Sequence, residues 1–320
     1  MNGDVLRTPS TSVGNVDLRG KNCYVAERRL PDGTVSRIGL VRGDCLDLMD
    51  VAPMLVGDAY VGAVVTSPPY NLGIRYSLYD DGVSRTSYLD WLERVFHKVH
   101  ALMSHDGSLF LNLGASPKNP WGPMDVASRL RPFFVLQNTF IWVKSVYIKN
   151  HTHGEDIEVN VGHVKAINSS RFVNDQWEYV FHFTKSGDVP IDRSAIGVPF
   201  KDKTNLARWK RSGEEGLRCR GNVWYVPYET IQRRDKDRPH PASFPSGLVE
   251  MCLRLHGLSK RPIVLDPFSG IGTTPIAAGK LGLSSVGIEV DPVYHGEAVR
   301  RAREAFQDAH RIGVSNQARS

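Results

Sequence analysis

The residues best suited to chemistry in this chain are Ser67, Pro68, Pro69 and Tyr70, which follow the apolar stretch 63–66. Proline lacks the N–H that a central strand needs, so the two prolines predict that a buried strand ends here. The carboxyl ends of strands are where open α/β sheets bind ligands. A hydroxyl, a rigid carbonyl and an aromatic ring at that edge suit a planar amino group. A plain strand end with a core tyrosine has the same sequence, so both interpretations stay open.

A second group of candidates lies about two hundred residues further along, where an apolar strand pattern precedes a glycine turn and a small-residue helix pattern. Gly270 and Gly272 allow the backbone to bend tightly and to approach a ligand closely. Asp266 offers a carboxylate to a cationic amine. The next predicted strand, 285–291, contains Glu289, an acid about twenty residues after the glycines that can accept both hydroxyls of a ribose. This segment therefore predicts a site for a nucleoside cofactor.

A dinucleotide-binding loop is the competing interpretation of these glycines. Its third glycine is missing, because Pro275 stands at that position. The carboxylate of Asp266 would also repel a pyrophosphate. The loop is therefore better suited to a cofactor with a cationic end.

Together the two motifs resemble those of S-adenosylmethionine-dependent DNA amino-methyltransferases, which modify N6 of adenine or N4 of cytosine. The catalytic motif precedes the cofactor loop here, which is similar to the permuted beta group of that family. The resemblance covers most of the chain from about residue 40 onward. It implies a Rossmann-like α/β fold, with a mostly parallel twisted sheet, helices on both faces and an inserted target-recognition region.

The resemblance also implies roles for the matched residues. It makes Ser67, Pro68, Pro69 and Tyr70 the catalytic loop. The residues that it implies for binding S-adenosylmethionine, and its product S-adenosylhomocysteine, are Asp44, Phe244, Asp266, Phe268, Gly270, Gly272, Thr273, Thr274 and Glu289.

Double-stranded DNA is the expected partner, and basic residues interleaved with aromatic ones between Asp192 and Arg238 suit contacts to phosphates and bases. A solvated charged loop is the alternative for this segment. A polar stretch, 162–172, is expected to border the pocket for the target base. The residues expected to bind DNA are Asn71, His163, Lys165, Arg171, Arg208, Lys210, Arg211, Arg218 and Arg220.

Composition agrees with a DNA partner. The net charge of +6 suits a polyanion, and no stretch has the apolar length of a membrane span. The four cysteines form no C-x-x-C pair, so we expect reduced thiols in the cytoplasm, near the nucleoid, and neither a zinc site nor any other metal site. A homodimer and a cognate restriction nuclease are two further partners that the resemblance allows.

The expected domain organisation has six parts. Residues 1–20 and 311–320 are predicted to be tails, and 21–42 a hairpin accessory to DNA binding or dimerisation. The catalytic half of the core spans 43–185, the target-recognition region 186–238, and the cofactor-binding half 239–310.

The expected mechanism follows from the target amine, whose lone pair is delocalised into the base. The Ser67 side chain and the Pro68 carbonyl are expected to accept its hydrogens, which frees the lone pair for in-line attack on the sulfonium methyl. The base must leave the duplex, and Tyr70 is expected to stack on it.

The target base is predicted to be adenine, modified at N6, with cytosine N4 as the alternative. In the resembling family, Ser67 is more usual among cytosine enzymes, whereas Asn71 directly after the tyrosine is commoner among adenine enzymes. Two other classes stay open, a methyltransferase for RNA or a small molecule and a catalytically dead DNA-binding regulator.

Overall fold

A ten-stranded mixed sheet organises the fold, which the computed structural model describes for residues 12–13, 16–17, 23–50, 52–57, 60–71, 82–152, 155–162, 167–200, 216–227, 244–306 and 310–314. Five neighbouring central strands are parallel, and antiparallel pairings extend the sheet on both sides. In sheet order the strands are β13 (Val223–Tyr225), β7 (Val135–Val143), β10 (Trp177–Thr184), β6 (Met103–Leu113), β5 (Val61–Thr66), β14 (Val264–Asp266), β15 (Ser285–Glu289), β4 (Val35–Arg42), β3 (Cys23–Arg29) and β16 (His310–Val314).

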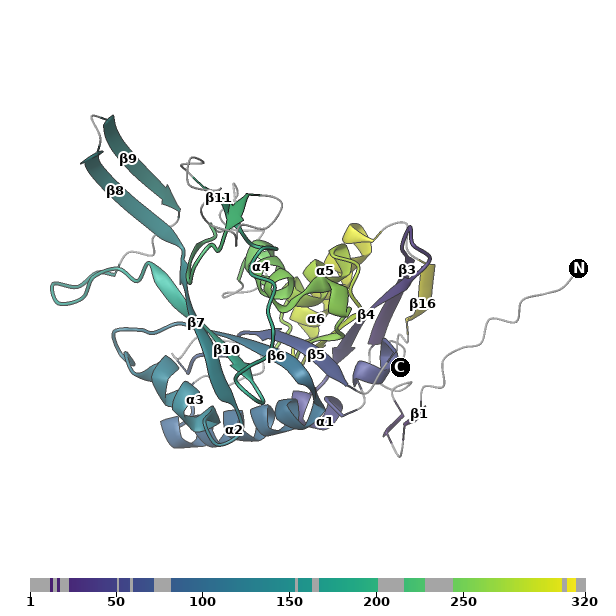
Figure 1. The fold of residues 1–320 in the computed structure, drawn as a ribbon. Coiled ribbons are helices and arrows are strands. Elements are labelled where there is room, and N and C mark those ends of the chain that lie inside the picture. Colours follow the sequence, from purple (N-terminus) through teal and green to yellow (C-terminus); the bar gives the residue numbers. More distant parts are fainter. Residues whose placement is uncertain are drawn as a thin grey trace, which may run out of the picture.

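Helices cover both faces of this sheet (Figure 1). One face carries α1 (Cys45–Leu48), α2 (Arg85–Leu102) and α3 (Gly122–Leu130), and the other carries α4 (Ser246–His256), α5 (Thr273–Lys280) and α6 (Pro292–Ala305). The parallel centre and the two helical layers confirm the predicted Rossmann-like α/β fold.

Shorter elements complete the described part of the chain. They are the 3-10 helices η2 (Ala52–Leu55) and η3 (Leu258–Lys260) and the strand pairs β1 (Ser12–Val13) with β2 (Val16–Asp17), β8 (Ser145–Thr152) with β9 (Glu155–Gly162), and β11 (Val198–Pro199) with β12 (Leu217–Arg218). None of the described helices combines the length and the apolar character needed to cross a bilayer.

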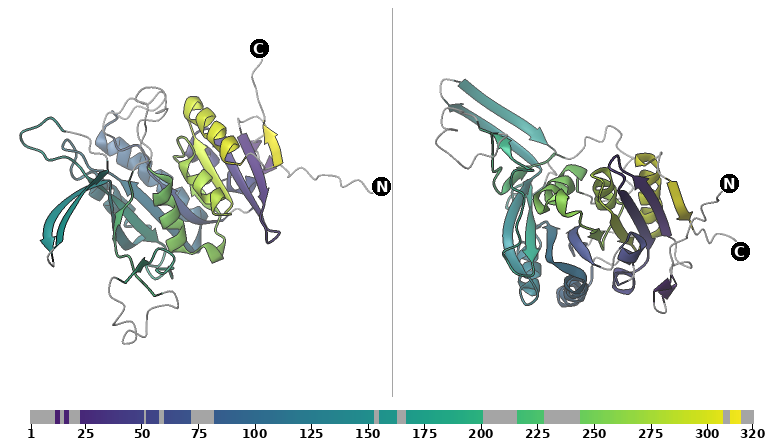
Figure 2. Two further views of the ribbon diagram at one scale, coloured as in Figure 1. Left: turned by 90° about the horizontal axis from the view of Figure 1, so that it is seen from above. Right: turned by 45° about the vertical axis from the view of Figure 1, so that its right-hand side comes forward.

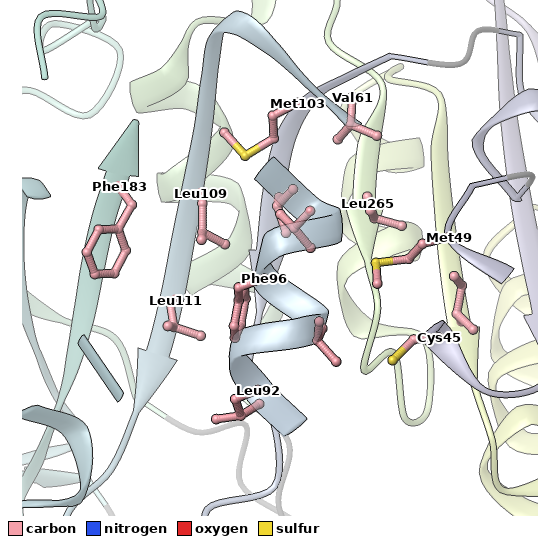
Figure 3. Close-up of a cluster of buried hydrophobic side chains, with 14 of the residues drawn as sticks. Cys45, Met49, Val61, Leu92, Phe96, Met103, Leu109, Leu111, Phe183 and Leu265 are labelled. Atoms are coloured by element: carbon pink, nitrogen blue, oxygen red, sulfur yellow. The ribbon is translucent and has the colours of Figure 1, made fainter. Parts of the chain in front are cut away.

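The apolar stripe of α2 explains how the helix that contacts the Ser67–Tyr70 loop is held. Ser84 caps its start, because the Ser84 side chain accepts a hydrogen bond from the Ser87 N–H. Leu92 and Phe96 of the helix then pack in the same buried cluster as Leu111 of β6 (Figure 3). Fully burying side chains of this size stabilises a fold by roughly 1.5–3 kcal/mol each.

The two candidate motifs follow neighbouring strands. Val264 and Leu265 of β14 pair in parallel with Ala63 and Val64 of β5, so both strands end at the same edge. After β5 the chain enters the helical layer of α2, whereas after β14 it enters the opposite layer with α5. Such a change of side between neighbouring strands opens a crevice where α/β sheets bind ligands.

The hairpin expected at residues 21–42 is an integral part of the main sheet. β3 and β4 pair in an antiparallel register, and β4 pairs in parallel with β15. In the turn, Thr34 donates its backbone N–H to Asp32, and Arg261 forms an ion pair with the same aspartate. The hairpin therefore extends the main sheet beside β15, and its accessory role in DNA binding or dimerisation stays a prediction.

The strands β8 and β9 form a long arm that projects away from the sheet (Figures 1 and 2). Their ladder runs from the pair Ser145 and Gly162 to the pair Thr152 and Glu155. The arm follows β7 directly, at the sheet edge distant from β16.

Two helical glycines provide a test of the packing. A Cβ at Gly279 in α5 would lie 2.3 Å from Ile38 Cδ1 and 2.9 Å from Phe306 Cζ, whereas a Cβ at Gly296 in α6 meets nothing within 4 Å. We expect Gly279→Ala to lower the free energy of unfolding by about 1–3 kcal/mol. Gly296→Ala should raise it by about 0.5–1 kcal/mol, because alanine favours the helix. Urea unfolding of both variants measures this, and effects of the same sign would contradict the packing of α5.

Candidate active site

The loop Ser67–Tyr70, the candidate catalytic loop, leaves β5 as the sequence predicts and is held from the α2 side. The Tyr88 hydroxyl on α2 donates a hydrogen bond of 2.6 Å to the Pro69 carbonyl. Ser67 Oγ donates to the Tyr70 hydroxyl at 2.9 Å, so the loop brings the hydroxyl groups of the two predicted residues into direct contact. Pro68 between them is buried.

The Tyr70 hydroxyl contacts a cluster of polar side chains on the neighbouring strands, formed by Asn112, Lys144 and Glu178. It lies 3.0 Å from Glu178 Oε2 on β10 and 3.2 Å from Asn112 Oδ1 on β6. Asn112 Nδ2 in turn donates to Glu178 Oε2 at 3.0 Å. Lys144, directly after β7, pairs with Glu178 Oε1 at 2.9 Å, and the two side chains are 15% and 12% exposed.

These three residues, Asn112, Lys144 and Glu178, are absent from the sequence-based site. Their sequence signal is a polar residue at the end of an otherwise apolar strand pattern, which more often marks the limit of a sheet core. Only the antiparallel pairing of β10 with both β6 and β7 brings them together beside Tyr70.

Asp266 joins the two motifs. Thr66, the last residue of β5, donates its hydroxyl to Asp266 Oδ1 at 2.6 Å, and the Phe268 N–H donates to the same oxygen at 3.1 Å. The Thr274 hydroxyl donates to the Val65 carbonyl at 3.0 Å. Asp266 is 1% exposed, and burial raises the pKa of its carboxyl from 3.8 to about 6.

The glycine loop has the geometry that its sequence predicts. Gly270 and Gly272 have φ angles of 51° and 77°, in the left-handed region that favours glycine. Gly272 precedes the first turn of α5, in which Thr273 and Thr274 are buried. From α6, Arg301 donates to the Ile271 carbonyl at 2.8 Å and so fixes the outer part of the loop.

Glu289 closes the other side of this loop. Its carboxylate accepts the Gly270 N–H at 2.7 Å and the Asp291 N–H at 2.8 Å. Burial raises the pKa of the Glu289 carboxyl from 4.5 to about 7. The Gly43 N–H donates to the Glu289 carbonyl, which brings the exposed Asp44 to the same edge, where its side chain also caps α1 through the Leu46 N–H.

Aromatic rings line the region between the loop and α2. The half-buried Phe268 lies 5.4 Å from Trp91 and 6.5 Å from Phe96, measured between ring centroids. Trp91, which is not among the predicted cofactor residues, is a further candidate for the cofactor site. Phe244, predicted to cover the cofactor, packs against the core cluster that contains α4.

The residues predicted to bind DNA do not form one group. Asn71 has a φ angle of 55° and donates its side-chain amide to the Val83 carbonyl. Arg171 is exposed and stacks on Phe172. Arg220 Nε donates to the Ile196 carbonyl at 2.9 Å, and Arg218 is exposed. His163, Lys165, Arg208, Lys210 and Arg211 lie outside the described residues.

Comparisons with known proteins agree with this arrangement. Residues 61–300 match the N6/N4 DNA methylase family. The type II methyltransferase M.ScaI of Streptomyces caespitosus is 30% identical over 285 residues, which cover 85% of this chain and 83% of that protein. The DNA adenine methyltransferase YhdJ of Escherichia coli K12 is 24% identical over 82% of this chain and 81% of its own length.

The fold has solved counterparts as well. The structure of the PvuII DNA methyltransferase, described as cytosine-N4-specific, superposes with a TM-score of 0.58 at 17% identity, over 84% of this chain and 91% of that one. The likeness supports the fold, and the family match covers both candidate motifs. The chain therefore belongs to the S-adenosylmethionine-dependent DNA amino-methyltransferases.

Proposed function

We propose that this chain methylates N6 of adenine in double-stranded DNA, with Ser67–Tyr70 as the catalytic loop and the segment from Asp266 to Glu289 as the cofactor site. The observation that carries the proposal is the link between Thr66 and Asp266. It fixes the end of the catalytic strand against the start of the cofactor loop. A methyl donor and an acceptor amine would thus be held at one edge of the sheet.

The cofactor site fits S-adenosylmethionine in its donor groups. The left-handed glycines leave the backbone open to close approach, and the ionised Glu289 carboxylate can accept ribose hydroxyls in addition to its two backbone N–H groups. Asp266 and the loop around it face the methionine end, and Phe268 and Trp91 supply apolar surface. When bound, the cofactor supplies an electrophilic methyl group on a sulfonium.

The catalytic loop prepares the amine. Ser67 Oγ and the Pro68 carbonyl accept the two amino hydrogens, which draws the nitrogen toward tetrahedral geometry and frees its lone pair. The ring of Tyr70 stacks on the base once it has left the duplex, for roughly 1–3 kcal/mol. Holding the amine in line with the methyl group supplies a large part of the acceleration.

The choice of adenine rests on three supports. Asn71 directly follows the tyrosine, the surrounding Pro-Pro-Tyr-Asn-Leu-Gly and Gly-His-Val-Lys stretches resemble those of adenine enzymes, and one relative is described as a DNA adenine methyltransferase. Cytosine N4 is the second candidate, because serine at position 67 is more usual among cytosine enzymes of the family.

Direct nucleoside analysis distinguishes the bases. Duplex DNA is incubated with the protein and S-adenosylmethionine, digested to nucleosides and analysed by mass spectrometry. We expect N6-methyldeoxyadenosine; N4-methyldeoxycytidine would transfer the proposal to the second candidate. Methylation of RNA alone, or cofactor binding without transfer to any DNA, would contradict the proposed function.

The proposed partners include DNA beyond the catalytic loop. Arg171 and Arg218 are exposed and remain proposed phosphate contacts. A cognate restriction nuclease is proposed because the relative M.ScaI is described as a type II methyltransferase. Homodimer formation, the target-recognition role of 186–238 and a cytoplasmic, nucleoid-associated location also stay predictions.

Asp266→Asn and Tyr70→Ala are expected to stop methyl transfer for different reasons. The asparagine can still accept from Thr66 and Phe268, but it cannot pair with the cofactor's cationic amine, so affinity for S-adenosylmethionine should fall by about tenfold to a hundredfold. Tyr70→Ala should leave that affinity unchanged and remove the stacking ring. Titration calorimetry and transfer of labelled methyl groups measure the two effects, and an active Asp266→Asn protein with normal affinity would contradict the cofactor assignment.

Affinity for S-adenosylmethionine is expected to rise by about tenfold to a hundredfold between pH 5.5 and pH 7. Ionised Glu289 accepts hydrogen bonds from the ribose hydroxyls. Its pKa is about 7 in the free protein, so below this pH the Glu289 carboxyl must lose a proton before the cofactor binds. The raised pKa of Asp266, about 6, acts in the same direction at the lower end. Calorimetry across this range measures the rise. Glu289→Gln should bind weakly with a flatter profile, and a wild-type profile without any rise would contradict the role of Glu289.

A further inference from the structure

Ser67 has an ambiguity that an acidic side chain at its position would not have. A serine hydroxyl carries one donor proton and two acceptor lone pairs, so it can either donate to a bound base or accept from it. Only the acceptor role activates an amino group. Something outside Ser67 must therefore fix the direction of its hydrogen bond.

The polar group beside Tyr70 fixes that direction. Ser67 Oγ lies 2.9 Å from the Tyr70 hydroxyl, which lies 3.0 Å from Glu178 Oε2 and 3.2 Å from Asn112 Oδ1. A carboxylate and an amide oxygen accept hydrogen bonds but cannot donate them. The Tyr70 proton is therefore used on either of these partners, and the Tyr70 oxygen is left to accept from Ser67.

The orientation of the Asn112 amide is itself determined. Its Nδ2 donates at 3.0 Å both to Glu178 Oε2 and to the Tyr179 carbonyl, two groups that only accept. The amide oxygen must then face Tyr70. Asn112 Oδ1 and Glu178 Oε2 are thus both acceptors toward Tyr70, and the direction of the hydrogen bonds is the same whichever of the two takes the proton.

The position of Glu178 beside Tyr70 is fixed by an ion pair with Lys144 and by close packing against Gly114. Lys144 pairs with Oε1, which leaves Oε2 to Tyr70 and Asn112. Gly114 leaves no room between the partners, because a Cβ there would lie 2.9 Å from Tyr70 Cε2 and 3.1 Å from Glu178 Cδ. Hydrogen bonds in such a partly buried chain polarise one another.

We propose that Glu178 is a positioning residue that acts through the Tyr70 hydroxyl to hold Ser67 as a hydrogen-bond acceptor for the target amine. The carboxylate orders the two hydroxyls in one direction and makes Ser67 Oγ more electron-rich. Glu178 thus supplies from β10 the effect that a carboxylate at position 67 would supply directly. The proposal rests on the assignment of Ser67 and Tyr70 to the catalytic loop.

Two conservative variants test the hydrogen bonds from Ser67 through Tyr70 to Glu178 without removing the stacking ring. Tyr70→Phe removes one hydroxyl, and Glu178→Gln replaces the carboxylate by an amide of the same shape. We expect each to slow single-turnover methyl transfer by about tenfold to a hundredfold, with affinities for S-adenosylmethionine and duplex DNA unchanged within about threefold. The matched control is Glu27→Gln, which removes a carboxylate paired with Arg37 at the same 2.9 Å on the distant β3–β4 hairpin and should transfer at the wild-type rate.

Moving the negative charge from position 178 to position 67 distinguishes the positioning role of Glu178 from a purely structural one. Ser67→Asp places an acceptor-only group at the amine, so Ser67→Asp combined with Glu178→Gln should be at least about tenfold faster than Glu178→Gln alone. A loss of packing at position 178 would not be repaired by a change at position 67. A double variant with no gain, or full-rate transfer by either Tyr70→Phe or Glu178→Gln, would overturn the inference.

Ser67→Ala keeps the two proposals distinguishable. If it abolishes transfer while Tyr70→Phe and Glu178→Gln remain fast, the catalytic loop stands and the role of Glu178 fails. If Ser67→Ala transfers at the wild-type rate, the assignment of the catalytic loop fails, and the inference about Glu178 fails with it.

Discussion

The hydrogen bond between Thr66 and Asp266 is the interaction on which the rest of the site depends. It joins the ends of two neighbouring parallel strands that are two hundred residues apart in the sequence. Because Asp266 is 1% exposed, losing the Thr66 hydroxyl would remove a donor from a buried carboxylate that water cannot readily replace. The same carboxylate accepts the Phe268 N–H, so the start of the glycine loop and the end of β5 are both bonded to Asp266.

Ionising Asp266 and Glu289, the two buried carboxyls of the candidate cofactor site, costs free energy in the free protein. Burial raises the pKa of both Asp266 and Glu289, so each carboxyl adds to stability below its pKa in the unfolded chain, and this contribution is lost as the pH rises through about 6 and about 7. Above about pH 7 this contribution is gone, so ionising the two buried carboxyls leaves the free protein less stable than at acid pH. Ligand groups that stabilise the ionised forms offset this cost, which links occupancy of the site to the stability of the sheet edge.

The sequence predicts the parts of the site that depend on local geometry. Two prolines end a strand, left-handed glycines turn a loop, and Glu289 follows at a fixed interval, so the fold and both motifs could be located without the structure. Glu178 could not, because its role arises from the register of β10 against β6 and β7, which brings its carboxylate to Tyr70. Asn71 shows the same limit, since its side chain turns to the Val83 carbonyl and its part at the pocket edge stays a prediction.

The hydrogen bonds from Tyr70 to Asn112 on β6 and to Glu178 on β10 also affect how Ser67 bears on the identity of the target base. Either exocyclic amine needs an acceptor, and a serine whose proton is used on Tyr70 offers the same lone pairs to adenine N6 as to cytosine N4. With the negative charge placed on Glu178, the residue at position 67 no longer has to carry it. Selection between the bases must then come from groups that meet the ring itself, because the amino groups of the two bases are alike while their ring sizes and edges differ. Ser67 is therefore compatible with the proposed adenine specificity.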